Sequence, residues 1–533
     1  MSQPLKKIPD ATQPSRDPQA GLAASLARLR GWDWVVGGGL AVCLAYSIST
    51  ATVGWSHTLN DRHSFRQSQT ATTAFYLVNQ PFRWAYETPI LGKPWSIPME
   101  VPIYQWLVAR FSGLTDYPLD QTGRLVSFVF FLLAGFPLYG LFRLAGVETR
   151  LACLPVMLFM LSPFYLFWSR TFMIESTALF FSLVWLASAV CALKRKHIAW
   201  DAVAVLLGCL AAATKVTTFL GFLPVVGLLM VLFAWPDWSF PRNLDALKRH
   251  LFRIGLLCLL PLGMALLWVT FSDTIKAENP LAAAYLTSNC PHHSEWNYGT
   301  IEQKLSGFVW GIILGRFPEL IGLPPLAWLL LGMVLTVTLV HRRRWRETLF
   351  CLGAFLIAPT LFTNLHFVHD YYANANGVFL LGAFAFALVG LLEDPRTRLA
   401  GTFFFLLTVL AAVGGHRQFY LPRQLKDNRE ILEAAEYIRT VTPQDSVIIC
   451  LGNDWSPLVS YYSQRRALNL PMDNEGKTPS ALVAEAFRNL RDEKVGAVVL
   501  VEPVAYPQEL AMEQLREAGI HAPVLSIKNL PRF

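Results

Sequence analysis

Charged residues are scarce in this sequence. Asp, Glu, Lys and Arg make up 15% of the 533 residues, whereas Ala, Val, Ile, Leu, Met, Phe, Trp, Tyr and Cys make up 53%. A globular domain of average composition carries about 25% charged residues. The composition therefore excludes an ordinary soluble enzyme and indicates a protein whose main solvent is lipid.

Paired cysteines are also missing, and we expect that the first apolar segment is not a cleaved signal peptide. The 8 cysteines stand singly, without a CxxC pair or a zinc spacing, which excludes a disulfide framework and a cysteine metal site. The first apolar segment follows a polar stretch of about thirty residues and lacks a cleavage site of small residues. We therefore expect this segment to remain as a membrane span.

Long apolar runs are abundant instead. A helix needs about 20 apolar residues to cross the hydrocarbon, and about eleven segments meet this length. They begin near residues 34, 125, 151, 174, 200, 217, 252, 322, 347, 373 and 399. Thr214 and Lys215 interrupt one long run, which we interpret as two short helices joined by a tight turn. The sequence thus predicts a polytopic α-helical membrane protein with about eleven transmembrane helices.

The distribution of basic residues predicts the orientation. With the N-terminus inside, the cytoplasmic segments collect nearly twice as many Lys and Arg as the longer loops on the opposite side. This bias predicts long outward loops at residues 56–123 and 272–320. The net charge of +8 lies in the membrane part, so it reports topology and attraction to anionic lipid, and we expect no nucleic-acid partner.

Three regions follow: a cytoplasmic segment (1–32), a transmembrane domain (33–415) and a soluble domain (416–533). In the last region helical and strand-like segments alternate, which is typical of a small α/β domain with a mostly parallel sheet. It contains neither N-glycosylation sequons nor paired cysteines. We therefore expect a bacterial inner-membrane protein whose active site and C-terminal α/β domain lie in the periplasm.

Polar residues crowd against the end of the first span, from Asn60 to Thr70, and an amphipathic stretch to Val78 follows, which we expect along the membrane interface. One interpretation is an interfacial belt with snorkelling cations. Ionisable groups at membrane depth are functional candidates, and we interpret Asp61, His63 and Glu100 as catalytic. A carboxylate or imidazole there can take a proton from an attacking hydroxyl.

This first loop resembles that of the GT-C membrane glycosyltransferases, in particular the protein mannosyltransferase-like family and the lipid A aminoarabinose transferases. The resemblance rests on Asp61 just after the first span, on Arg66 behind it, and on the Pro98–Trp106 block before an apolar run. It implies a polyprenyl-phosphate-linked sugar donor and places Asp61 at the family's catalytic Asp. An alternative register places His63 there.

Further candidates fall on the same side of the predicted membrane. Arg170 and Glu175 flank a turn, where they form either a structural ion pair or a substrate contact. Lys215 is either a snorkelling lysine or a substrate ligand. The expected donor phosphate and sugar ligands are Arg66, Gln69, Lys93, Arg170, Glu175, Lys215, His366, His369, Asp370 and Tyr371.

A metal site is an alternative for the segment from His366 to Tyr372. Two histidines at i and i+3 share a helix face, and Asp370 adds an oxygen, so His366, His369 and Asp370 are the candidate ligands of a divalent metal. The resemblance favours phosphate or sugar binding by this segment. Because cations can neutralise the departing phosphate, we expect that no cofactor is required, although a divalent metal remains an alternative.

The sequence therefore predicts a glycosyltransferase, of hexosyl or pentosyl type, that moves a sugar from a polyprenyl-phosphate donor to a lipid, glycan or protein acceptor with inversion. Membrane lipids are its other partners. The alternatives are a ligase or polymerase of lipid-linked glycans, and a polytopic transporter or flippase. Transporters often contain repeated halves with broken helices, and the sequence contains no such repeat.

Overall fold

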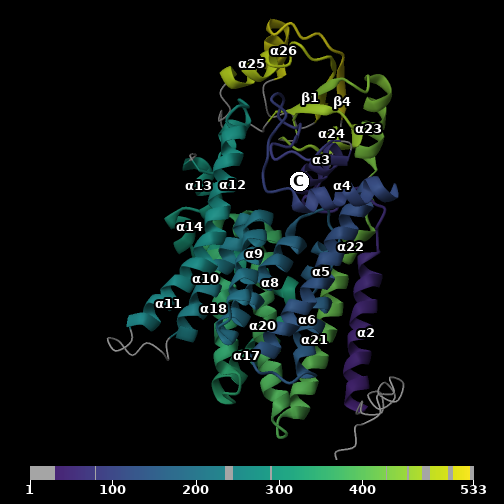
Figure 1. Cartoon of the computed structure of the whole chain (residues 1–533). Helices are drawn as coiled ribbons and strands as arrows, with labels where there is room; N and C mark the ends of the chain where they lie inside the picture. Colours follow the sequence, from purple (N-terminus) through teal and green to yellow (C-terminus); the bar gives the residue numbers. More distant parts are fainter. Residues whose placement is uncertain are drawn as a thin grey trace, which may run out of the picture.

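The computed structural model describes residues 31–78, 80–234, 244–288, 291–427, 429–452, 455–470, 480–501 and 508–527. Expectations for residues 1–30, including most of the predicted cytoplasmic segment, lie outside these ranges. A bundle of long helices forms one part of the molecule, and a smaller part with a sheet sits at the end of the bundle where α2 (Gly31–Ala51) ends (Figure 1).

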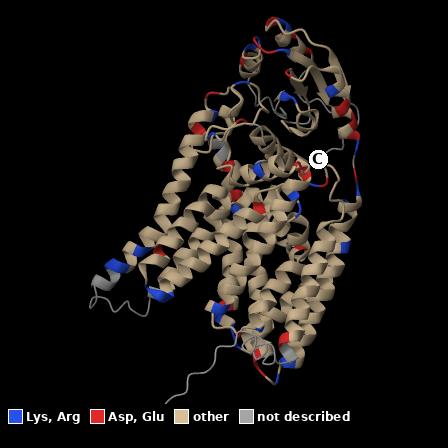
Figure 2. Ribbon diagram, turned by 45° about the vertical axis from the view of Figure 1, so that its right-hand side comes forward, with Lys and Arg blue, Asp and Glu red and all other residues tan. Residues whose placement is uncertain are grey.

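The helices of the bundle follow the predicted apolar segments. They are α2, α5 (Leu119–Leu144), α6 (Leu154–Leu161), α7 (Pro163–Trp168), α8 (Glu175–Arg195), α9 (Ile198–Thr214), α10 (Val216–Ala234), α11 (Leu244–Ile254), η3 (Gly255–Leu259), α12 (Leu260–Lys276), α17 (Pro324–Val340), α18 (Trp345–Leu361), α20 (Ala373–Glu393) and α21 (Arg398–Phe419). The long helices are almost free of charge along their length, and charged residues gather at their ends (Figure 2).

Within the described ranges, six helices are long and apolar enough to cross a membrane, or seven if a pair of helices bent by 95° (Gly307–Ile321 and Pro324–Val340) is one span. The predicted number of about eleven is not confirmed. Several helices are short: α9 has 17 residues, which at about 1.5 Å per residue falls short of about 30 Å of hydrocarbon. The predicted break at Thr214 and Lys215 is confirmed, because α9 ends at Thr214 and α10 begins at Val216.

Helix α20 lies at the centre of the bundle. Its span is 94% buried within the protein, whereas that of α2 is 22% buried. Aromatic side chains fill the core around it, including the stacked rings of Phe142 and Phe386 at 4.0 Å. Asp370, which lies just before α20, is accordingly only 4% exposed.

Short elements cap the bundle at the end nearest the sheet. The first long loop contains α3 (Ser64–Val78) and α4 (Ile103–Thr115), and residues 363–372 form α19 (Thr363–Val368) and η5 (Asp370–Tyr372). The second long loop contains η4 (Ala282–Tyr285), α13 (Pro291–Tyr298), α14 (Ile301–Leu305), α15 (Gly307–Gly315) and α16 (Phe317–Ile321). Helix α3 is almost inaccessible from Gln67 to Ala74. In the stretch expected along the membrane interface, Leu77 is buried, whereas Phe75 and Val78 are partly exposed.

A four-stranded parallel sheet stands in the C-terminal region, in the order β2-β1-β3-β4. Its elements are α22 (Leu421–Leu425), α23 (Glu430–Val441), β1 (Val447–Leu451), α24 (Leu458–Ser463), β2 (Arg466–Asn469), α25 (Ser480–Arg488), β3 (Val495–Val501), α26 (Gln508–Glu517) and β4 (Val524–Ile527). All five residues of β1 are buried, because helices cover both faces of a parallel sheet and every strand position then faces a core.

The first long loop joins this sheet at the free edge of β2. The backbone N–H of Gly92 donates to Ala467 at 3.1 Å, and that of Asn469 donates to Ile90 at 2.8 Å. Ile90 and Leu91 are fully buried in the same apolar cluster as β1 and β3. The sheet and the loop that follows the first helix therefore pack as one unit.

Candidate functional site

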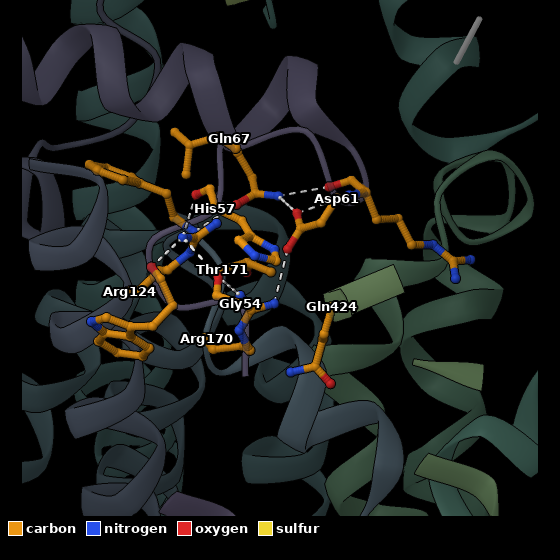
Figure 3. A network of polar contacts seen from close by, with 12 residues as sticks. Gly54, His57, Asp61, Gln67, Arg124, Arg170, Thr171 and Gln424 are labelled. Carbon is orange, nitrogen blue, oxygen red and sulfur yellow. Dashed lines mark hydrogen bonds and ion pairs between the residues drawn. The ribbon is translucent and has the colours of Figure 1, made fainter. Parts of the chain in front are cut away.

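Asp61 lies in a polar network between the end of α2 and the start of α3 (Figure 3). Its Oδ2 accepts from Nη1 of Arg170 at 3.0 Å, and its Oδ1 accepts from the side chain of Gln67 at 2.6 Å and from the backbone of Arg62 at 2.9 Å. The carboxylate is 4% exposed. Both of its oxygens are therefore already engaged by donors of the protein.

Two buried arginines hold the loop before Asp61. Arg124 and Arg170 are 0% and 1% exposed. Arg124 donates to the carbonyls of Trp55 and His57 at 2.6 and 2.7 Å, and Arg170 donates to Gly54 at 2.9 Å. Burial, together with the neighbouring charge of Arg124, lowers the pKa of Arg170 to about 10, so this guanidinium stays charged at pH 7 and binds Asp61 as an ion.

His63 pairs with Asp370 from the far end of the chain. The two side chains meet at 2.8 Å between Nε2 and Oδ1, and Arg62 forms an ion pair with the other carboxylate oxygen. Asp370 is 4% exposed and His63 is 23% exposed. In the described part of the chain, Nδ1 of His63 makes no hydrogen bond, so Asp370 fixes the ring while the second nitrogen is left for a ligand.

The backbone and the aromatic neighbours of His63 constrain its ring further. The residue has φ of +47°, a left-handed conformation that costs energy for a residue with a side chain. Its ring lies 4.9 Å from that of Tyr371 and 5.7 Å from that of Trp168. The strained backbone and the tight surroundings leave the imidazole little freedom to turn.

Glu100 and Arg66 form a second ion pair beside this centre. Nη2 of Arg66 lies 3.2 Å from both carboxylate oxygens, Nη1 donates to Gln69 at 2.5 Å, and Gln105 donates to Glu100 at 2.8 Å. Burial is the largest single influence on Arg66 and opposes its charge, but Glu100 together with further neighbours, Glu175 among them, outweighs it, so the pKa of Arg66 is raised. Arg66 is a permanent cation held in place by its neighbours.

Lys215 and Glu175 form a third ion pair, at 2.5 Å, where the break between α9 and α10 meets the start of α8. The Lys215 ammonium lies 4.5 Å from the ring centre of Tyr372 and 5.4 Å from that of Tyr371. Lys215 is thus part of the cluster and not a lysine extended towards headgroups. The alternative of an ion pair between Arg170 and Glu175 is not realised, because each has another partner.

His366 and His369 lie close to these cations. Burial lowers the pKa of His366 to about 4 and that of His369 to about 3, and the charge of Lys215 acts in the same direction on both. Both imidazoles are therefore neutral at pH 7. The ring of His369 stacks on that of Tyr371 at 5.3 Å.

The geometry does not assemble the candidate metal ligands. Nδ1 of His366 lies 3.0 Å from the Phe362 carbonyl, and both oxygens of Asp370 are engaged by His63 and Arg62. Among the described residues, no three His, Cys, Asp or Glu side chains are placed to share a metal ion.

One predicted ligand lies elsewhere, and Arg124, Arg316 and Glu319 were missed. Lys93 forms an ion pair with Glu493 of the C-terminal region, so the structure does not bring it to the cluster. Arg316 and Glu319 line a hollow with His366 and Asp370. The signal for Arg316 in the sequence is a lone cation beside apolar runs, at the end of the second long loop.

Two crystal structures share this fold. ArnT from Cupriavidus metallidurans bound to undecaprenyl phosphate matches with a TM-score of 0.58 at 13% identity, over 87% of this chain and 92% of that chain. ArnT from the same organism in the apo state matches with a TM-score of 0.56 at 13% identity, over 86% and 91% of the two chains. No protein-family model matches the chain, and no curated protein matches its sequence.

At this identity the likeness establishes the fold. The chain is a polytopic helical membrane protein with the architecture of ArnT. The residues of the first loop indicated a resemblance to the GT-C enzymes, and the two ArnT structures confirm it at the level of the fold.

Proposed function

We propose that the protein is a membrane glycosyltransferase that moves a sugar from a polyprenyl-phosphate donor to an acceptor hydroxyl on the periplasmic face of a bacterial inner membrane. The observation that carries the proposal is the contact between His63 and Asp370 among several cations, at one end of a helix bundle with the ArnT fold. One of the two ArnT structures is bound to undecaprenyl phosphate, which supports a donor of this class.

His63 is the base in this proposal. Its Nε2 is bonded to Asp370, so the proton of the neutral ring stays on that nitrogen and Nδ1 carries the lone pair. A base oriented by a buried carboxylate recurs in many enzymes. Asp61 suits the role less well, because Arg170, Gln67 and the Arg62 backbone already bind its oxygens.

Three cations offer a site for the donor phosphate. Lys215 and Arg316 both act electrostatically on His366, and Lys215 and Arg66 both act on His369. They therefore converge on the segment between α18 and α20. In the described structure Arg316 donates only to the backbone carbonyls of His366 and Phe367 and forms no ion pair, although the carboxylates of Glu319 and Asp370 lie near enough to interact with its charge.

The reaction is then a single displacement. The acceptor oxygen attacks the anomeric carbon, its proton passes to Nδ1 of His63, and the bond to the phosphate oxygen breaks. The leaving phosphate gains negative charge, which the fixed cations stabilise. The proposed step therefore requires no metal. Attack from the face opposite the leaving group inverts the anomeric centre.

The test is transfer by the purified chain. Incubated in detergent with a radiolabelled polyprenyl-phosphate sugar, the protein should move the label to an acceptor fraction, and mass spectrometry of cells with and without the gene should show which surface glycan changes. Label that stays on the polyprenyl phosphate with every acceptor fraction, together with an unchanged set of lipid-linked sugars in the cells, would contradict the proposal.

A further inference from the structure

Helix α24 of the C-terminal region lies against the loop that carries Asp61 and His63. Two consecutive tyrosines on this helix reach the start of α5. The Tyr461 hydroxyl donates to Oδ1 of Asp120 at 2.5 Å, and the Tyr462 hydroxyl donates to Oδ2 at 2.8 Å. One carboxylate therefore receives two phenols from a segment more than three hundred residues away in the sequence.

Both tyrosines pack near Leu59 of the loop, but in the described structure only the Tyr462 hydroxyl is hydrogen-bonded to it. The backbone N–H of Leu59 donates to the Tyr462 hydroxyl at 2.7 Å. Leu59 is fully buried and lies two residues before Asp61. The Tyr462 hydroxyl thus accepts from the loop and donates to α5, whereas Tyr461 bonds α5 alone.

The same turn of α5 holds the loop from the other side. Arg124 lies four residues after Asp120, so both side chains project from the same helix face. Arg124 binds the carbonyls of Trp55, His57 and Thr58, and Asp120 reaches Leu59 through Tyr462. The path of the chain into Asp61 is therefore fixed by α5 directly and by α24 through one hydroxyl.

The Tyr462 hydroxyl remains protonated and can always donate its hydrogen bond to Asp120. Burial, with the nearby Asp120 charge, raises the pKa of Tyr462 well above its ordinary value of 10, so the phenol keeps its proton at any working pH. A second contact beside it closes the interface: the ring of Trp455, just before α24, lies 4.6 Å from Phe65 on α3 and 4.9 Å from Tyr285 of the second long loop.

We propose that Tyr462 is a positioning residue of the transfer reaction, through which the C-terminal α/β region sets the path of the Asp61–His63 loop. This inference rests on the proposed function for its catalytic part. The loop contact itself stands on the hydrogen bond to Leu59, which is independent of the substrate.

The test compares Tyr462→Phe with Tyr461→Phe in the full-length chain. Each change removes one hydroxyl that donates to Asp120, so the two match in size and in the lost contact with Asp120, although Tyr461 is buried and Tyr462 partly buried. Only Tyr462→Phe removes the contact with Leu59. We expect Tyr462→Phe to lower kcat about tenfold, since small misplacements of reacting groups cost rate, with little change in KM for the donor. Tyr461→Phe should keep the wild-type kcat, and the two variants should have similar melting temperatures.

A second readout needs no substrate. Hydrogen exchange followed by mass spectrometry should show faster exchange in peptides covering residues 54–63 for Tyr462→Phe and wild-type exchange for Tyr461→Phe. Equal exchange in the two variants would overturn the loop contact, and equal kcat would overturn the positioning role. If the wild-type chain transfers no sugar while the two variants still differ in exchange, the proposed function is overturned, and with it the catalytic part of this inference. The contact between Tyr462 and the loop is then upheld.

Discussion

At the scale of single residues, the ion pair between Asp61 and Arg170 is an element of architecture. Both side chains are almost fully buried, and the guanidinium also binds the Gly54 carbonyl. Removing one charge of a buried pair leaves the other uncompensated, which costs about 3–5 kcal/mol. The pair therefore fixes the loop on which His63 stands.

The first prediction follows from this pair. Asp61→Asn keeps the shape of the side chain but removes its charge, so the free energy of unfolding should fall by about 3–5 kcal/mol, measured by thermal or denaturant unfolding in detergent. The control is Glu148→Gln, which removes a carboxylate that is 61% exposed and 3.9 Å from Arg150. The control should melt with the wild type; an Asp61→Asn variant that does the same would show that the pair does not hold the loop.

The sequence identified many side chains of the candidate site but not their contacts. The first-loop cluster and the segment from His366 to Tyr371 were identified, because ionisable groups beside apolar runs are conspicuous. Their partners were not, since the contact of His63 with Asp370 joins positions 307 residues apart. Arg124 was overlooked because a cation at the start of a span looks like a topology signal until its carbonyl partners are seen.

At the scale of elements, the close approach of α5 to the turn that carries Arg170 depends on a glycine. A Cβ atom at Gly123 would lie 2.2 Å from Cδ2 of Phe172, whereas one at Gly140 on the same helix would meet nothing within 4 Å. Phe172 follows Arg170 by two residues in the sequence. Movement of its ring therefore displaces the turn that binds Asp61.

This gives a matched pair of substitutions. Gly123→Ala should destabilise the protein by about 1–3 kcal/mol through overpacking and lower the transfer rate, measured by unfolding and by product formation. Gly140→Ala should be neutral or stabilising by up to about 1 kcal/mol, because alanine favours the helix over glycine. Equal free energies of unfolding and equal transfer rates in the two variants would contradict the close contact between Gly123 and Phe172.

The length of apolar runs predicted the positions of the long helices. The break between α9 and α10 was visible because Thr214 and Lys215 interrupt an apolar run. The burial of the polar part of α3 was not visible, because α4 and α24, which cover its Ser, Gln and Thr side chains, are distant or separate segments of the sequence. A sequence reports polarity, and burial of a polar helix depends on which distant segments cover it.

At the scale of the whole molecule, the sheet lies at the same end of the bundle as α3 and the loop before it, which carries Asp61 and His63 (Figure 1). The turn between α17 and α18, with its basic residues 342–344, lies at the opposite end. The positive-inside rule predicts that this turn is cytoplasmic. The proposed function follows this prediction in placing the sheet and the cluster on the periplasmic side, where they would meet acceptors.

The orientation can be tested directly. Alkaline phosphatase, which folds only outside the cytoplasm, should be active when fused at the C-terminus and inactive when fused at Arg343 in the turn between α17 and α18. Green fluorescent protein at the same two positions should give the opposite pattern. Activity at Arg343 with none at the C-terminus would invert the proposed topology.

The most direct measurement of the central claim is the single-turnover rate of sugar transfer by His63→Asn, with donor in excess of its KM. The account predicts a fall of about 10²–10⁴-fold, the range that general base catalysis supplies, with a melting temperature equal to that of the wild type. Asp370→Asn should also slow transfer, because the ring then loses the partner that orients it. A His63→Asn variant that transfers sugar at the wild-type rate would contradict the account.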